Sequence, residues 1–171
     1  AHPGQTLELY IGFSTRNLDR PGEILKKVNQ FGFEGTLKRG TRHWNSVLGK
    51  IEIEGASDEQ RTIFYSALYH SSLKPADFHN ENPFTRTDGP FFFDLSTLWD
   101  LYKTHLPLTM TLWPEWGKEF VEFLAEVAHR EGAFPVSYLM NNSPECFAKQ
   151  ATGLCHIILS DAQMRGIDGP W

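Results

Sequence analysis

The pattern of apolar and polar residues changes once along the chain, near residue 57. Before this point, residues 6–13 alternate between apolar and polar side chains, which predicts a half-buried strand. After it, apolar side chains recur every three or four residues, as on one face of an amphipathic helix. This spacing predicts helices over residues 57–73, 96–107, 114–132 and about 145–166, joined by long loops.

Two shorter helical periods precede these helices. They run from Ile24 to Phe31 and from Phe33 to Leu48, although two internal glycines weaken the second. The early part of the chain is therefore expected to be a strand followed by a connector, and the later part a series of helices. Helices in series with long loops are typical of a helical bundle or an α/α toroid.

The ends of the predicted helices carry ordinary boundary residues. Ser57 precedes Gln60 by three residues, which is the spacing of a capping box. Other boundaries follow single-residue rules: Ser96 as an N-cap, Pro107 as a kink or an end, Pro114 as a first helical residue and Gly132 as a C-cap.

Composition narrows the classes of function. The 171 residues are enough for one ordinary domain, and the formal net charge of −5 argues against nucleic acid as a partner, because a phosphate binder needs a basic face. No window approaches the roughly 18 consecutive apolar residues of a membrane span, and the first residues do not resemble a signal peptide. Cys146 and Cys155 are expected to be small, buried and unbridged, and no zinc-binding spacing occurs.

The stretch Phe93–Leu108 combines an apolar stripe with aromatic, acidic and hydrogen-bonding side chains. Trp99 beside Asp100 suits a sugar, because an indole covers the apolar face of a pyranose while a carboxylate accepts its hydroxyl protons. The alternative is structural, with a core tryptophan beside an acid that favours the helix dipole. Taken alone, the residues favour the structural alternative.

Two other segments hold candidate groups. Loop 74–92 carries acidic residues, asparagines and a histidine, and such oxygens suit calcium, but the spacing is not that of an EF-hand and favours a solvated loop. Glu145 lies at the predicted start of the last helix, where an acid either reaches a substrate or simply favours the helix dipole.

Three motifs, taken in order, resemble glycoside hydrolase family 92, the calcium-dependent exo-acting α-mannosidases. They are Phe64–Pro75, Thr97–Asp100 followed by Leu106–Leu108, and Ser160–Ile167. The resemblance covers nearly the whole chain, because the segment from Trp44 to Gly55 is also similar to the family's linker.

The resemblance implies a fold and a place within it. The family has an N-terminal β-sandwich followed by an (α/α)6 toroid. Residues 1–14 would be the last strand of the sandwich, residues 15–56 the helical linker and residues 57–171 the N-terminal part of the toroid. Family chains are much longer, so this mainly α chain is expected to be an internal fragment whose partner is the rest of its own chain.

The resemblance also implies a mechanism. Family members are inverting enzymes, in which one acid protonates the leaving oxygen and a carboxylate activates water. It places Trp99 and Asp100 at the terminal mannose. Glu145 would be the general acid, as the one carboxylate of Asn141–Cys146, although the family's Gly-Asn-Glu-Thr-like motif is not preserved there. A different acid, or an activated leaving group such as a phosphate, is the alternative.

The base and most calcium ligands of the family come from later in the chain. Ca²⁺ is therefore expected as a cofactor without ligands in these residues, and the fragment alone is expected to be inactive. The substrate would be an α-mannose-containing glycan, cleaved by a secreted, periplasmic or cell-surface enzyme. Two other functions stay open: a glycan-binding protein that has lost catalysis on the same fold, and an α/α-toroid enzyme such as a polysaccharide lyase.

Overall fold

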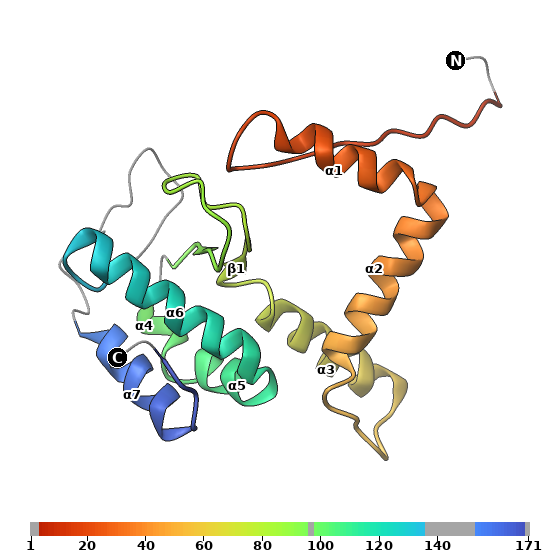
Figure 1. The fold of residues 1–171 in the computed structure, drawn as a ribbon. Coiled ribbons are helices and arrows are strands. Elements are labelled where there is room, and N and C mark those ends of the chain that lie inside the picture. The colour runs from red at the N-terminus through yellow and green to blue at the C-terminus, as the bar shows by residue number, and fades with distance from the viewer. Residues whose placement is uncertain (1–3, 96–97, 136–152, 170–171) are drawn as a thin grey trace. The chain divides into compact units, whose positions relative to one another are not determined.

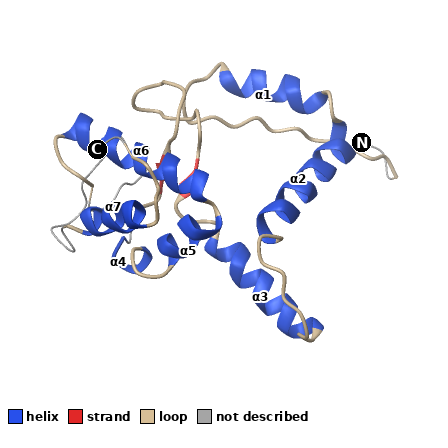
Figure 2. Ribbon diagram, turned by 60° about the horizontal axis from the view of Figure 1, so that its bottom comes forward, coloured by secondary structure: helices blue, strands red, loops and turns tan. Residues whose placement is uncertain are grey.

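The computed structural model describes residues 4–95, 98–135 and 153–169. The chain divides into two compact units, Ala1–Ala56 and Ser57–Trp171. Helices dominate both units (Figure 2), so the predicted mainly helical fold is confirmed, while the toroid itself stays a prediction. None of the helices in the described ranges is both long and apolar enough to cross a membrane.

The first unit consists of an N-terminal segment and two helices, α1 (Arg20–Asn29) and α2 (Gly32–Leu48), shown in Figure 1. Both lie where the apolar spacing predicts them. The turn before α1 is held by Asn17, whose Oδ1 accepts hydrogen bonds from the backbone N–H groups of Asp19 and Arg20. No side chain of either helix is buried.

The strand predicted over residues 6–13 is not formed. The segment runs as irregular chain, and its apolar side chains are open to solvent, with Leu7 81% exposed. A strand needs a hydrogen-bonding neighbour, and the described part of this chain pairs no other segment with it. The assignment of residues 1–14 to a β-sandwich therefore stays a prediction.

The second unit carries a short hairpin and five helices, α3 to α7, among its described residues (Figure 1). Its elements in order are α3 (Asp58–Ser71), β1 (Ala76–Asp77), β2 (Phe92–Phe93), α4 (Leu98–Leu101), α5 (His105–Leu112), α6 (Pro114–Glu131) and α7 (Leu154–Met164). The strands pair antiparallel, with Ala76 opposite Phe93 and Asp77 opposite Phe92. Helices α5, α6 and α7 contact one another, and α4 contacts α5.

The core of the second unit is aromatic. Phe92 of β2 is completely buried, with its ring centroid 5.3 Å from that of Phe120, 5.6 Å from that of Phe123 and 5.2 Å from that of Trp116. Helix α7 adds the predicted stripe that includes Cys155, which is only 2% exposed. Cys146 lies outside the described residues. The hairpin is thereby fixed against α6 by tightly packed rings.

Several predicted helix boundaries are confirmed. Ser57 accepts a hydrogen bond from the Gln60 backbone, and the Gln60 side chain accepts one from the Ser57 backbone, so the capping box is complete. Pro114 is the first residue of α6, and Gly132 ends that helix with a φ of 75°, a left-handed conformation that glycine adopts without strain.

Two predicted helices differ from the observed ones. Residues 96–107 do not form one helix, because α4 ends at Leu101 and α5 begins at His105. Pro107 is the third residue of α5, where its missing N–H is not needed, and the helix continues past it to Leu112. The last helix begins at Leu154 after Gly153, not near Glu145, and the proposed cap Ser96 lies outside the described residues.

Candidate functional site

The β1–β2 hairpin delivers the chain to the candidate sugar-binding residues. Immediately after β2, Asp94 adopts a φ of 64°, which turns the chain out of the strand. Its Oδ2 lies 2.8 Å from Nζ of Lys74, just before β1. This ion pair joins the two ends of the hairpin beside the start of α4.

The loop inside the hairpin is an ordered structure. Phe78 donates its N–H to the Phe91 carbonyl, and Gly89 donates to Oδ1 of Asn80. Asn82 is 2% exposed, and its Oδ1 accepts hydrogen bonds from the N–H groups of Phe84 and Thr85. The asparagines Asn80 and Asn82 of this loop therefore hold its own backbone, while Asp77, His79 and Asp88 remain exposed.

A calcium site is not assembled by the residues that the structure describes. No group of three or more His, Cys, Asp or Glu side chains occurs among them in a metal-binding arrangement. Ca²⁺ binding therefore stays a prediction that rests on the resemblance alone.

Helix α4 presents Trp99 and Asp100 away from the core. Leu98 is completely buried and anchors the helix. Because successive residues turn about 100° around a helix, Trp99 is half-buried and Asp100 is exposed. Among the described residues, no hydrogen bond or ion pair engages the Asp100 carboxylate.

A second tryptophan of this unit shows the contrast. The ring of Trp116 stacks on Phe120 at 5.0 Å between centroids and meets Phe92 at 5.2 Å. Trp99 is not among the described side chains that pack against this core. The observed packing therefore gives the structural role to Trp116 and leaves the indole of Trp99 at the rim.

His105 closes the segment at the first residue of α5. Its side chain is partly buried, and desolvation lowers its pKa from the ordinary value of 6.5, although a hydrogen bond with the Lys74 backbone opposes the shift. Its Nε2 is buried without a hydrogen-bond partner among the described residues. The hydrogen bond with the Lys74 backbone ties the start of α5 to the chain before β1.

Asp77, His79 and Glu119 lie in or beside the hairpin, and no sequence motif assigns them a function. Desolvation raises the pKa of Asp77 although its side chain keeps solvent exposure, and a hydrogen bond from the His79 backbone opposes the shift. His79 Nδ1 lies 3.6 Å from Oε2 of Glu119 on α6. These groups border the hairpin, and the sequence signal for them was only the acidic composition of the loop.

The motif Ser160–Ile167 has a structural explanation. Arg165 donates from Nε to Oδ2 of Asp161 at 2.7 Å and from Nη1 to Oγ1 of Thr111, which ties the end of α7 to α5. Gly166 takes a φ of 78°, and Ile167 donates its N–H to the Ala162 carbonyl. These contacts terminate α7 and return Ile167 to the core.

The three predicted site residues thus have different outcomes. Trp99 and Asp100 are successive residues of α4, the first half-buried and the second exposed. Glu145 lies outside the described residues. The arrangement on α4 is suited to holding a hydroxylated ring rather than to breaking a bond.

Comparisons with known proteins point to carbohydrate-active enzymes. The glycosyl hydrolase family 92 catalytic domain matches residues 22–170. A protein described as an uncharacterized secreted glycosidase from Arthroderma benhamiae is 31% identical over 98 residues, which are 54% of this chain and 13% of that protein.

A solved structure gives the same indication. The family GH92 inverting mannosidase from Bacteroides thetaiotaomicron VPI-5482 is similar with a TM-score of 0.70 and 26% sequence identity, over 86% of this chain and 21% of that one. The chain therefore spans only a small part of the length of both relatives.

Proposed function

Because the chain belongs to glycosyl hydrolase family 92, we propose that it forms part of an exo-acting α-mannosidase that hydrolyses terminal α-mannosyl linkages with inversion. Similarity to a family GH92 inverting mannosidase supports the choice of mannose as the sugar and of inversion as the stereochemical outcome. Similarity to a protein described as a secreted glycosidase supports an exported enzyme that acts on glycans outside the cytoplasm.

The observation that carries the proposal is the position of Trp99 and Asp100. Trp99 is half-buried outside the core cluster and Asp100 is exposed beside it, whereas Trp116 packs against the core, so the residues of α4 are available to a ligand. In the proposed enzyme, Trp99 covers the apolar face of the terminal mannose. Asp100 accepts hydrogen bonds from its hydroxyl groups and fixes the orientation of the ring.

Glu145 is proposed as the acid that protonates the leaving oxygen. The base that activates water is proposed to lie in a part of the enzyme beyond these residues, since inversion requires two carboxylates separated by about 6.5–9.5 Å. On this proposal the 171-residue chain alone is inactive. Ca²⁺ is proposed as a cofactor of the longer enzyme, with ligands outside the described residues.

The experiment measures the product of an aryl α-mannoside with the longer protein that contains this chain. NMR is expected to show β-mannose as the first product, and a chelator is expected to abolish turnover until calcium is restored. Retention of the α-anomer, or full turnover in excess chelator, would contradict the proposal.

A glycan-binding protein is the second candidate, favoured by the loss of the family's acid motif over Asn141–Cys146. Turnover and binding measured in the unchanged protein and in the Glu145→Gln variant distinguish the enzyme from the glycan-binding protein. Turnover that falls by about 100-fold or more while binding of a mannoside is retained supports the enzyme with this acid. Binding of mannoside without turnover in the unchanged protein supports the binder.

A further inference from the structure

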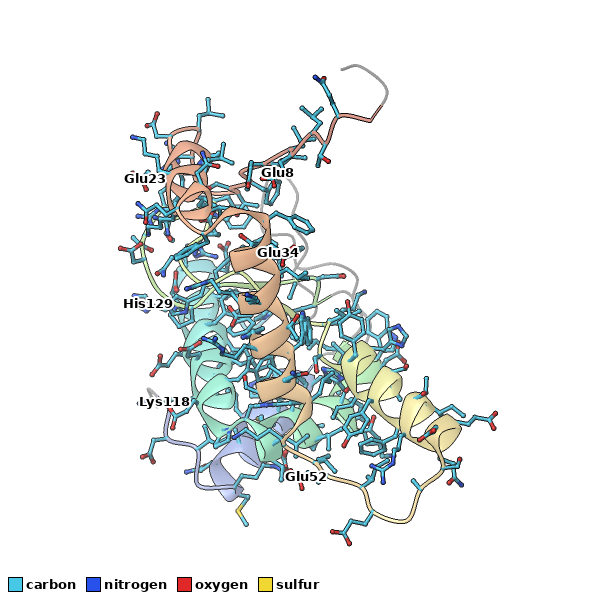
Figure 3. All side chains as sticks on the ribbon, turned by 90° about the vertical axis from the view of Figure 1, so that its right-hand side faces the viewer. Glu8, Glu23, Glu34, Glu52, Lys118 and His129 are labelled. Atoms are coloured by element: carbon cyan, nitrogen blue, oxygen red, sulfur yellow. The ribbon has the colours of Figure 1, made fainter. Side chains whose placement is uncertain are left out.

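The two helices of the first unit are basic although the chain as a whole has a net charge of −5. Their cationic residues are Arg20, Lys26, Lys27, Lys38, Arg39 and Arg42. Only two carboxylates, Glu23 and Glu34, lie on the same helices (Figure 3), and Glu23 is within 3.9 Å of Arg20. The excess of positive charge is therefore local to α1 and α2.

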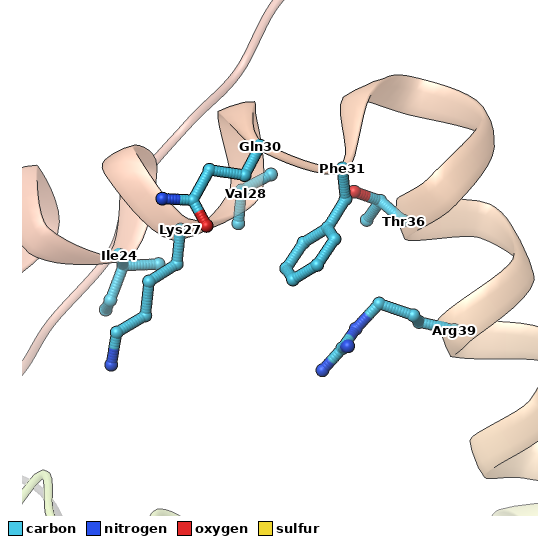
Figure 4. A pocket seen from close by; sticks show the side chains of 7 residues that line it. All are labelled: Ile24, Lys27, Val28, Gln30, Phe31, Thr36 and Arg39. Carbon is cyan, nitrogen blue, oxygen red and sulfur yellow. The ribbon is translucent and has the colours of Figure 1, made fainter.

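A pocket of about 340 Å³ opens between these helices (Figure 4). Ile24, Val28 and Phe31 give it an apolar wall, and Lys27 and Arg39 bring their charged ends to its opening, one from each helix. Gln30 and Thr36 complete the lining. A volume of this size lies in the range of small-molecule sites, and an apolar wall with a few polar groups is their usual composition.

The two cationic side chains of the pocket, Lys27 and Arg39, differ in their contacts with the protein. Arg39 places its guanidinium 4.4 Å from the centroid of the Phe31 ring, a cation–π contact that limits its freedom before any ligand arrives. Lys27 lines the pocket from α1. Among the described residues, neither has a carboxylate partner, and neither Glu23 nor Glu34 lines the pocket.

We propose that this pocket binds a phosphorylated sugar. Two unneutralised cations match a phosphate monoester of about two negative charges, and the planar guanidinium of Arg39 matches its oxygens in a bidentate fashion. The wall formed by Ile24 and Val28 takes the apolar face of the ring, and the Gln30 amide lies within the lining to meet hydroxyl groups. The site belongs to the first unit and is separate from Trp99 and Asp100 of the second.

Calorimetry at low salt tests this proposal directly. The probes are glucose 6-phosphate, glucose and inorganic phosphate, each titrated into the intact protein. Glucose 6-phosphate is expected to bind at least about tenfold more tightly than either of the other two. If inorganic phosphate binds as tightly as glucose 6-phosphate, the pocket only attracts anions and does not recognise the sugar. If glucose 6-phosphate does not bind, the pocket is not a binding site for it. Either result would overturn the proposal.

Matched variants localise the site. Lys27→Gln and Arg39→Gln are each expected to weaken binding of glucose 6-phosphate by about tenfold or more, since a charge-assisted hydrogen bond is lost. Lys26→Gln and Lys38→Gln remove the same charge from the adjacent positions, which do not line the pocket, and are expected to change the affinity less than about threefold. Equal effects in both pairs would show a diffuse charge effect and would overturn the pocket, and circular dichroism verifies that each variant is folded.

Discussion

The two units use the same helical periodicity with opposite results. Helix α1 and helix α2 are amphipathic, yet no residue of either is buried, and Phe33 on α2 is 59% exposed. Helix α6 of the second unit buries Phe120, Val121, Phe123, Leu124 and Val127 along with Gly117. An apolar stripe therefore predicts which face of a helix is available for packing, but not whether this chain covers it.

The aromatic residues of the two units also have different surroundings. In the second unit, rings such as Phe92 are enclosed by other rings, and the hairpin and helices depend on them. In the first unit, Phe31 is 44% exposed and holds the guanidinium of Arg39 at a pocket. We therefore expect the stability of this chain to depend mainly on the packed rings of the second unit.

The largest expected effect compares one phenylalanine from each unit. Phe92→Ala removes a completely buried ring and is expected to lower the free energy of unfolding by about 3–5 kcal/mol. Phe33→Ala removes a ring that is already largely solvated and is expected to cost less than about 0.5 kcal/mol. Denaturant unfolding of both variants measures the two free energies. Similar losses would contradict the expected difference between the two units.

A smaller effect compares two asparagines with the same hydrogen bonds. Asn82 is buried in the hairpin loop, Asn17 is exposed before α1, and each accepts two backbone N–H groups. Asn82→Ala is expected to cost about 1–3 kcal/mol, because buried donors lose their partner, and Asn17→Ala about 1 kcal/mol or less. Chemical denaturation tests the order, and a larger loss in Asn17→Ala contradicts it.

The start of the second unit gives the next effect. Ser57→Ala removes one half of the capping box of α3 and is expected to cost about 1 kcal/mol. Ser66→Ala is the control, since Ser66 is exposed within the same helix and does not cap it. A thermal melt that shifts equally for both variants would show that the cap contributes nothing specific.

The smallest expected effect is a dependence on pH in the second unit. Because the folded pKa of His105 is lowered, the unfolded chain binds more protons, and stability is lost as the pH falls below about 6.5 through the folded pKa. His105→Gln is expected to reduce this loss between pH 7.5 and pH 5. His129→Gln, at an exposed position of α6 (Figure 3), is expected to leave it unchanged, and an equal response in both would contradict the assignment to His105.

The sequence predicts local structure well where one residue decides it. Ser57, Pro114 and Gly132 mark their helix ends as expected, because capping and backbone rules act within one turn. It fails where distant contacts decide, as in the break between α4 and α5 and in the strand expected over residues 6–13, which has no neighbour in the described chain.

The candidate site shows the same limit. The sequence shows that Trp99 and Asp100 are adjacent. Whether Trp99 lies in the core or at its rim follows only from the structure, in which Leu98 is buried and Trp116 packs against the core. The Lys74–Asp94 ion pair, which joins the hairpin ends beside α4, was not foreseen because it depends on the hairpin register. The rim position of Trp99 and the Lys74–Asp94 ion pair both depend on tertiary contacts, so the hydrophobic periodicity of the sequence does not predict them.

The most direct test of the account measures kcat/KM for an α-mannoside in the longer enzyme that contains this chain. Asp100→Asn is expected to lower kcat/KM by about 100-fold while the thermal midpoint stays unchanged, because the carboxylate engages sugar hydroxyls and no described protein group. Glu52→Gln in the first unit (Figure 3) is the matched control and is expected to leave kcat/KM unchanged. Full activity of Asp100→Asn, or a loss explained by unfolding, would contradict the assignment of α4 as the sugar-binding helix.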